Sequence, residues 1–220
     1  MQIVSSYKVR IAESNQKIAR AFIDTLDLYR AAVDFFIALV LKRWDSVFVK
    51  EMPEQKQIKA MEQLCIRTKN RPDTPYDFSE KFYKFPSYLR RAAIRHAYGQ
   101  VSSYMAHLET WTKNRHGNPP GLPRAGRVFP PLYHKNMFVR DKINGLYSAR
   151  IKVFIRNTWD WMEVRLRKSD VDYLERYCCH RTEHVPTLYR QSRKVWSLAF
   201  PFTEEVELKP QKLSANNCLC

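Results

Sequence analysis

The sequence contains no uninterrupted apolar run long enough to cross a lipid bilayer. Its longest apolar stretch, residues 31–41, includes Asp34 and is followed by Lys42 and Arg43, whereas a spanning helix needs about 20 apolar residues. The N-terminus also lacks a charged region followed by an apolar one, which is the pattern of a secretory signal. We therefore expect a cytoplasmic protein with no membrane partner.

Catalytic motifs are missing as well. The 220 residues include only five glycines, and they contain no glycine-rich phosphate loop, no HExxH and no GxSxG. The carboxylates of the middle section are single, so none forms the pair that two-metal chemistry requires; they are Glu80, Glu109, Asp141, Asp160 and Glu163. We predict no catalytic residue and no cofactor within this chain.

Cysteine is scarce, with five in the chain, and without a secretory signal these residues are expected to be thiols in a reducing compartment. Cys178, Cys179, His180 and His184 lie close together in the sequence and raise the alternative of a zinc site. Adjacent cysteines lack the CxxC spacing that lets two thiolates face one ion, and no second pair follows. Core cysteines and a polar turn are the favoured interpretation, and no metal ligand is predicted.

Positive charge is the abundant feature. The chain has 38 Lys and Arg against 22 Asp and Glu, a net charge of +16, and residues 79–168 alone hold 18 against 5, an excess of 13. A local excess of that size indicates a polyanionic partner, most often nucleic acid. An acidic membrane surface is less favoured, because no basic helix with a clean apolar face carries the excess. A structural or protein-interaction module with an acidic partner remains the alternative.

Hydrophobic periodicity predicts one strand, then helices, then several strands. Alternation over 2–11 predicts a strand, and apolar spacings of three and four predict helices over 14–44, 54–68, 87–111 and 169–179. Alternation returns at 137–140, 150–168, 188–193 and 195–200. A lone opening strand must pair with later strands. We therefore expect an α+β fold, in which a small OB-like β-barrel (1–12 and 125–212) receives a helical insertion (13–124) after its first strand, and 213–220 begins a linker.

Residues 150–168 predict a β-hairpin with two different faces. Ile151 and Val153 share an apolar face with Met162 and Val164, while the other face is basic and aromatic. Such a face suits nucleic acid, because cations neutralise phosphates and flat rings stack on bases; an ordinary solvated sheet face is the alternative. In the bend, Trp159 is a candidate for base stacking, although a buried aromatic is the usual explanation for such a residue.

Two further segments carry the cations. One is the start of the helix that begins at Ser87, where like charges lie close together and repel each other. An anionic partner would explain that arrangement, and a merely solvated face is the alternative. The other segment is the loop 113–131, which is rich in proline and glycine. We expect these cations and those of the hairpin to form one groove wide enough for a duplex. The candidate nucleic-acid-binding residues are Lys81, Lys84, Tyr88, Arg90, Arg91, Arg95, Lys113, Arg115, Arg124, Arg127, Lys152, Arg156, Trp159, Arg165 and Arg167.

Several motifs together resemble the N-terminal half of TnpB proteins, transposon-encoded RNA-guided DNA endonucleases related to the compact type V CRISPR effectors. They are W-x-W-x-x-V-x-L from Trp159 to Leu166, P-x-L from Pro186, K-x-W-x-L-x-F-P from Lys194 to Pro201, and the helix FPSYLRRAAIRHAYGQVSSY. The resemblance runs along nearly all of the chain.

The resemblance implies that the barrel is a wedge domain and the helical insertion a recognition domain. In that family the two hold the guide RNA and the guide–target duplex, and they read a short motif in double-stranded target DNA, while base pairing reads the sequence. The family's metal-binding RuvC nuclease and its zinc site follow the wedge domain, beyond 215–220 here. We therefore expect no cleavage by this chain alone, Mg and Zn only in a nuclease half, and a prokaryotic, nucleoid-associated location. The chain is then either a fragment of a longer protein or a partner that needs a nuclease domain in trans.

Overall fold

The computed structural model describes residues 2–12, 15–48, 52–140, 145 and 147–206. They form a mixture of α-helices and antiparallel β-sheets, so the predicted α+β class is confirmed. The expected linker at 213–220 and the carboxylate of Asp141 lie outside the described residues. None of the described helices is long and apolar enough to cross a membrane.

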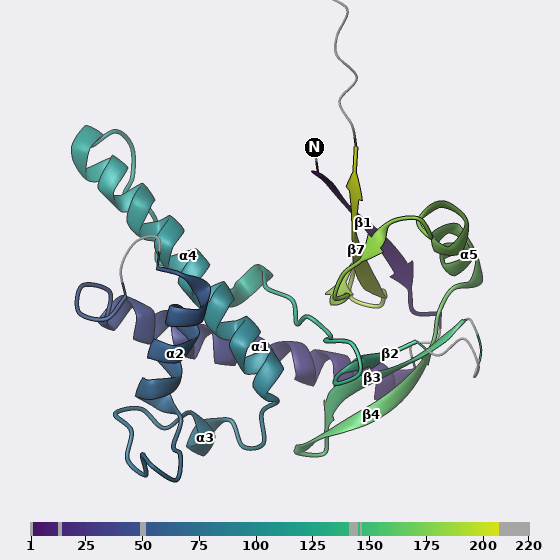
Figure 1. Ribbon diagram of the computed structural model, residues 1–220, viewed down its shortest axis with the longest axis horizontal. Helices are drawn as coiled ribbons and strands as arrows, with labels where there is room; N and C mark the ends of the chain where they lie inside the picture. Colours follow the sequence, from purple (N-terminus) through teal and green to yellow (C-terminus); the bar gives the residue numbers. More distant parts are fainter. Residues whose placement is uncertain (1, 13–14, 49–51, 141–144, 146, 207–220) are drawn as a thin grey trace, which may run out of the picture.

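The first sheet joins the two ends of the described chain. Strand β1 (Gln2–Arg10) pairs antiparallel with β7 (Trp196–Glu205) along its whole length, from Gln2 opposite Glu205 to Arg10 opposite Ser197. Figure 1 shows β1, in purple, beside the yellow β7. Two short strands, β5 (Thr182–Glu183) and β6 (Thr187–Arg190), also pair with β7. The prediction that the opening strand pairs with a later strand is confirmed.

The second sheet contains the hairpin. Its strands are β2 (Phe138–Val139), β3 (Ser148–Ile155) and β4 (Thr158–Arg165), in that order and antiparallel. The two sheets meet at an isolated bridge between Ile11, just after β1, and Leu166, just after β4. A second bridge joins Pro131, which precedes β2, to Thr187 of β6. They do not close into the expected barrel among the described residues, because β2 and β5 have only two residues each and cannot continue the ladder around.

Five α-helices and one 3-10 turn complete the fold. They are α1 (Gln16–Lys42), α2 (Glu54–Cys65), α3 (Phe78–Lys81), α4 (Ser87–Asn114), η1 (Ala125–Arg127) and α5 (Lys168–Tyr177). The apolar stripe predicted for the first helix is buried, and α4 lies across α1 (Figure 1). The predicted helices therefore exist, with ends shifted by a few residues, whereas α3 and η1 were not predicted.

Helices and sheets share one hydrophobic core. Thr25 of α1 ties the two parts together, since its buried hydroxyl donates to the Ala21 carbonyl oxygen at 2.7 Å and accepts the Phe154 N–H of β3 at 2.8 Å. An aromatic chain makes a second link: Phe85 lies 5.5 Å from Phe78 and 5.4 Å from Trp159, centroid to centroid. The helices and their loops, residues 15–48 and 52–127 (the helical block), therefore contact the hairpin at two points, through Thr25 and through Phe85.

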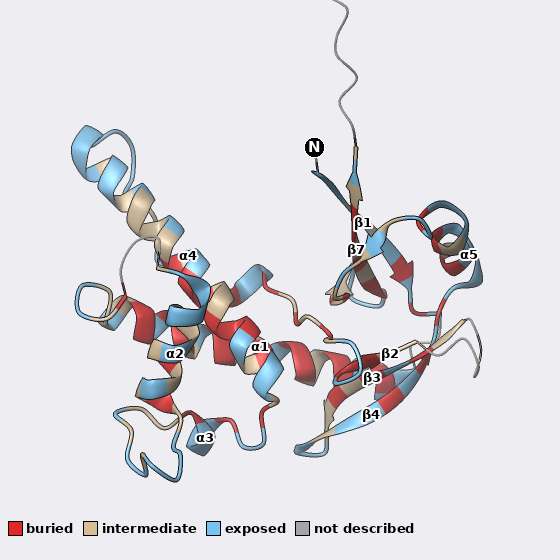
Figure 2. Cartoon of the chain, viewed as in Figure 1, coloured by how far each residue is buried: buried red, intermediate tan, exposed pale blue. Residues whose placement is uncertain are grey.

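The second half of α4 extends beyond this core. Its buried residues end at Val101, and from Ser102 to Asn114 every side chain is exposed or half-buried. Figure 2 shows this end of α4 projecting from the molecule, with pale blue and tan along it. The predicted apolar stripe does reach Trp111, but its last turns are only partly covered.

Candidate nucleic-acid interface

The β3–β4 hairpin presents the two faces that the alternation predicts. Ile151, Val153, Met162 and Val164 are buried against the core, and the residues between them point outward, as the alternating colours of β4 show (Figure 2). Because the inner face is anchored by burial, the outer face is held as a rigid platform. The hairpin is therefore well suited to present side chains to a partner.

An indole flanked by two cations stands on the outer face. The Trp161 side chain is 37% exposed, and its ring centroid lies 5.9 Å from the Arg150 guanidinium carbon and 6.0 Å from the Lys152 ammonium. We call these three residues the hairpin face. Cations at this distance are attracted by the ring quadrupole and hold the indole in place. A base could stack on such a ring while the cations neutralise the adjoining phosphates.

The turn of the hairpin lies one residue earlier than the alternation predicts. Arg156 and Asn157 form it, both with left-handed backbone (φ 50° and 61°), which matches the right-handed twist of the paired strands. Arg156 is thereby exposed at the tip. Beside it, Lys17 of α1 and residues of β4 line a hollow of about 370 Å³, whose two cations face the carboxylates of Asp160 and Glu163.

Trp159 occupies a seam between the sheet and the helical block. It is half-buried, with its ring centroid 5.4 Å from that of Phe85 and 5.6 Å from that of Phe154. The ring therefore packs as a buried aromatic, which is the alternative that the sequence left open. Trp161, two residues further on, has the exposed ring; its register opposite Lys152 on the outer face was the available signal.

Three candidate arginines of α4 are engaged with α2 and a nearby tyrosine. Arg90 lies 2.9 Å and Arg91 3.5 Å from the same oxygen of Glu62, and Arg95 lies 2.9 Å from a Glu54 oxygen. Arg95 also donates to the Tyr133 hydroxyl. These charges therefore brace α2 against α4, which is why a helix start with so many cations is tolerated without an external anion.

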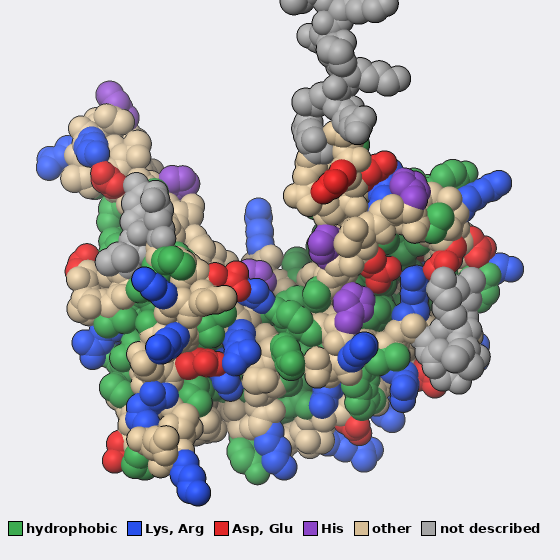
Figure 3. Space-filling model, in the orientation of Figure 1, with side chains coloured by type: hydrophobic (Ala, Val, Ile, Leu, Met, Phe, Trp, Pro, Cys, Tyr) green, Lys and Arg blue, Asp and Glu red, His purple; other side chains and the backbone are tan. Residues whose placement is uncertain are grey.

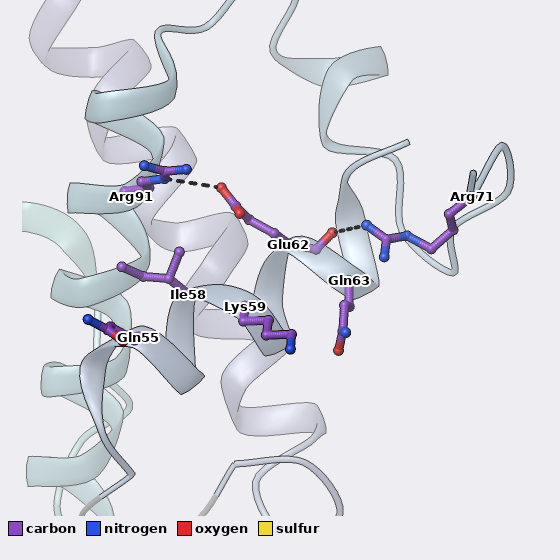
Figure 4. Close-up of a pocket in the computed structure, with 7 residues that line it drawn as sticks. All are labelled: Gln55, Ile58, Lys59, Glu62, Gln63, Arg71 and Arg91. Carbon is purple, nitrogen blue, oxygen red and sulfur yellow. Dashed lines mark hydrogen bonds and ion pairs between the residues drawn. The ribbon is translucent and has the colours of Figure 1, made fainter. Parts of the chain in front are cut away.

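The space between α2 and α4 is a hollow of about 470 Å³ (Figure 4). Arg91 faces it from α4, Lys59 from α2, and Arg71 from the loop after α2, where its guanidinium donates to the Glu62 and Ile66 carbonyl oxygens at 2.9 and 2.8 Å. The predicted residues are thus divided among hollows: Arg91 lines this one and Arg156 the one beside β4.

The loop between α3 and α4 adjoins the hairpin through Phe85. Tyr83 is 69% exposed and was not predicted as a site residue; the Lys84 ammonium lies 5.1 Å from its ring centroid. Lys81 is also exposed, whereas Tyr88 lies 5.5 Å from Tyr133, centroid to centroid, beside the braced arginines. This loop therefore places an exposed ring and a cation in a segment that contacts the hairpin, although the two are far apart in the sequence.

The remaining candidates lie elsewhere. Lys113 pairs with Glu109 at 2.8 Å, and Arg115 ends α4 in a left-handed conformation. Exposed side chains of Arg124 and Arg127 flank or belong to η1. Two more arginines follow the hairpin face along β4 and beyond it: Arg165, which is exposed, and Arg167, whose Nε lies 3.9 Å from Asp170. Figure 3 shows Lys and Arg side chains over both the helices and the sheets, with acidic side chains among them.

No group of three or more His, Cys, Asp or Glu among the described residues is arranged to hold a metal ion. Cys178 is buried and Cys179 exposed, while His184 Nε2 lies 2.5 Å from the Thr203 hydroxyl. The structure thus places the buried Cys178 and the exposed Cys179 side by side at the end of α5.

Burial shifts the pKa of several groups behind the interface. Desolvation lowers the pKa of His96 and raises that of Tyr29, whose hydroxyl lies 2.9 Å from His96 Nδ1 across the α1–α4 contact. It also raises the pKa of the buried Cys65 thiol to about 12. These groups are neutral near pH 7 and contribute to packing between the helices.

Two comparisons relate the chain to known proteins. A model of the Aq_aa04 family matches residues 5–155, which run from β1 to the end of β3. A protein of Aquifex aeolicus (strain VF5), named uncharacterized protein aq_aa04, is 26% identical over 165 residues, covering 66% of this chain and 91% of that protein. The matched region includes α1–α4 and the first strand of the hairpin.

Proposed function

The chain belongs to the Aq_aa04 family, and we propose that it is a nucleic-acid-binding protein whose main contact surface is the hairpin face. The observation that carries the proposal is the exposed Trp161 indole, held between Arg150 and Lys152 on a rigid sheet. Stacking on the ring supplies sequence-tolerant affinity, and the two cations supply the electrostatic part. Lys84 and Tyr83 extend the surface at the tip of the hairpin.

A merely solvated sheet face accounts for the hairpin less well. A single exposed ring on a sheet face is ordinary, so the proposal depends on the ring together with the two cations that flank it. Arg150 and Lys152 lie near this indole and make no ion pair among the described residues, although Glu163 stands opposite Arg150 on the neighbouring strand. An acidic protein could use the same cations and bury the same indole, so the binding experiment includes that partner as one of its outcomes.

We propose further that this chain is the nucleic-acid-holding half of a TnpB-like RNA-guided nuclease. In this proposal 1–12 and 125–212 act as the wedge domain, 13–124 as the recognition domain, and guide RNA and double-stranded target DNA as the partners. The full-length pairing of β1 with β7 around the helices supports that arrangement. The chain would bind without cleaving, with a nuclease domain supplied in trans, in the cytoplasm and on the nucleoid.

Binding to fluorescein-labelled structured RNA, measured by anisotropy across a salt series, tests the main proposal. We expect log K to fall linearly with log salt. Trp161→Ala should weaken binding roughly fivefold or more, because one stacked base is lost. The double substitution of Arg150 and Lys152 by alanine should reduce the salt slope by about 2. Tyr177→Ala, which removes a 50%-exposed ring from α5, is the matched control and should change neither.

Two outcomes would overturn these statements separately. Salt-independent or absent binding, or retention of an acidic protein after nuclease treatment, would refute the nucleic-acid proposal in favour of the protein-interaction alternative. Sequencing of RNA that copurifies with the chain tests the finer proposal: one defined structured RNA supports it, whereas a random sample of cellular RNA would refute the TnpB-like role and leave general binding intact.

A further inference from the structure

The projecting end of α4 is closed by a chain reversal. Arg115 ends the helix with φ 49°, and Gly117 follows with φ 73°, both in the left-handed region. The Trp111 indole N–H donates to the Gly117 carbonyl oxygen at 3.0 Å. This bond fixes the ring relative to the returning chain, so the surroundings of Trp111 are built before any ligand arrives.

A hollow of about 370 Å³ lies inside this reversal. Its lining includes the Trp111 ring, the imidazoles of His107 and His116, and the carboxamides of Asn114 and Asn118. The volume falls in the range of small-molecule sites, about 300–1,000 Å³. Unlike the hollows beside β4 and between α2 and α4, this one has no carboxylate among the described residues that line it.

We propose that this hollow binds one unpaired nucleobase, a proposal that rests on the nucleic-acid-binding function above. Flat rings suit the face of a base, and carboxamides, which both donate and accept, suit its polar edge. A lone phosphate would need a more cationic lining, and a metal ion more ligands than two imidazoles. Exposed Arg115, on the rim of the reversal, can neutralise the phosphate next to the bound base.

The position of the hollow sets the length of nucleic acid that reaches it. Helix α4 has 28 residues, so it is about 42 Å long at 1.5 Å per residue. The loop just before α4 adjoins the hairpin through Phe85, which packs against Trp159, and the hollow lies at the other end of the helix. An A-form RNA duplex, which rises about 2.8 Å per base pair, would need about 15 pairs to cover that distance. The base at α4 therefore belongs to a single-stranded end or loop beyond a duplex held at the hairpin.

The test compares two labelled RNAs with the full chain: a blunt duplex of about 16 base pairs, just above the estimate of about 15 pairs, and the same duplex with about eight unpaired nucleotides at each end. We expect the extended RNA to bind roughly fivefold or more tightly. His116→Ala and Asn118→Ala should remove most of that preference and leave affinity for the blunt duplex unchanged. His180→Ala, which removes a 56%-exposed imidazole at the other end of the molecule, is the control.

The possible outcomes separate this proposal from the main one. If both RNAs bind equally and the variants change nothing, the base site is refuted while the hairpin interface stands. If neither RNA binds, the nucleic-acid function itself fails, and the base site with it. Trp111→Phe keeps an aromatic ring but loses the hydrogen bond to Gly117. If this variant still prefers the RNA with unpaired ends, and Asn118→Ala does not, the base is held by its polar edge as well as by its face.

Discussion

Removing the Thr25 hydroxyl should loosen the joint between α1 and the hairpin. Thr25 is fully buried, and its oxygen is the acceptor for the Phe154 N–H at 2.8 Å. Thr25→Val keeps the shape of the side chain but leaves that N–H buried without an acceptor. An unsatisfied buried donor costs about 1–3 kcal/mol. For a chain of this size, that corresponds to a lower Tm by about 2–12 °C, at roughly 2–4 °C per kcal/mol.

Urea unfolding and amide hydrogen exchange measure the effect. Thr112→Val is the matched control, because the Thr112 hydroxyl also donates within its helix, to Leu108 at 2.8 Å, but is exposed. We expect the Phe154 amide to exchange faster in Thr25→Val and the control to resemble the parent protein. Equal stability of the two variants, or unchanged exchange at Phe154, would refute the view that this hydroxyl anchors the hairpin.

Three further predictions concern the helical block. Glu62→Gln should lower the free energy of unfolding by about 1.5–3 kcal/mol, because Arg90, whose side chain is only 17% exposed, loses a charged partner. The free energy of unfolding should fall as pH decreases below 6.5, the ordinary pKa of histidine, and His96 should leave it unchanged above that pH. Burial lowers the pKa of His96 in the folded chain, so below pH 6.5 the unfolded chain binds a proton that the folded chain does not. Thiol labelling should be fast at the exposed Cys179 and slow at Cys65, whose pKa is raised to about 12.

Each of these has its own control. Glu109→Gln removes an exposed carboxylate whose partner Lys113 is 70% exposed, and should cost less than about 0.5 kcal/mol; a loss equal to that of Glu62→Gln would contradict the bracing role. A pH profile that His96→Gln leaves unchanged would show that another group titrates. Labelling of Cys65 at the rate of Cys179 in the folded protein would mean that the core opens there.

The braced arginines change the meaning of the charge excess. Part of the surplus at the start of α4 neutralises carboxylates of α2, so these residues organise the helical block and leave the hairpin face and the loop before α4 as the surfaces free to meet an anion. Substitution of Arg90 should therefore reduce stability before it reduces binding, whereas substitution of Lys152 should do the reverse. Measuring stability and binding for both variants therefore distinguishes a variant that is unfolded from one that is folded but has lost its binding site.

Local pattern alone determined most elements of this protein. Alternation over residues 150–168 set both faces of the hairpin, since successive side chains of a strand point to opposite sides. The apolar spacing of the long helices set their buried stripes, and the need of a lone strand for a partner placed β1 against the later strands. Net charge, which is a sum over the chain, indicated the class of partner.

Only the tertiary structure decided which cations are free and which rings are covered. Arg90 and Arg91 meet Glu62, some 28 residues away in sequence, and Trp159 meets Phe85, because packing of helices and loops brings those groups together. No periodicity encodes such contacts, since they depend on how elements cross and not on how each one repeats. For the same reason the sequence singled out Trp159, in the predicted bend, although the alternation had placed Trp161 on the outer face. Only the structure shows that the loop before α4 packs against Trp159 through Phe85.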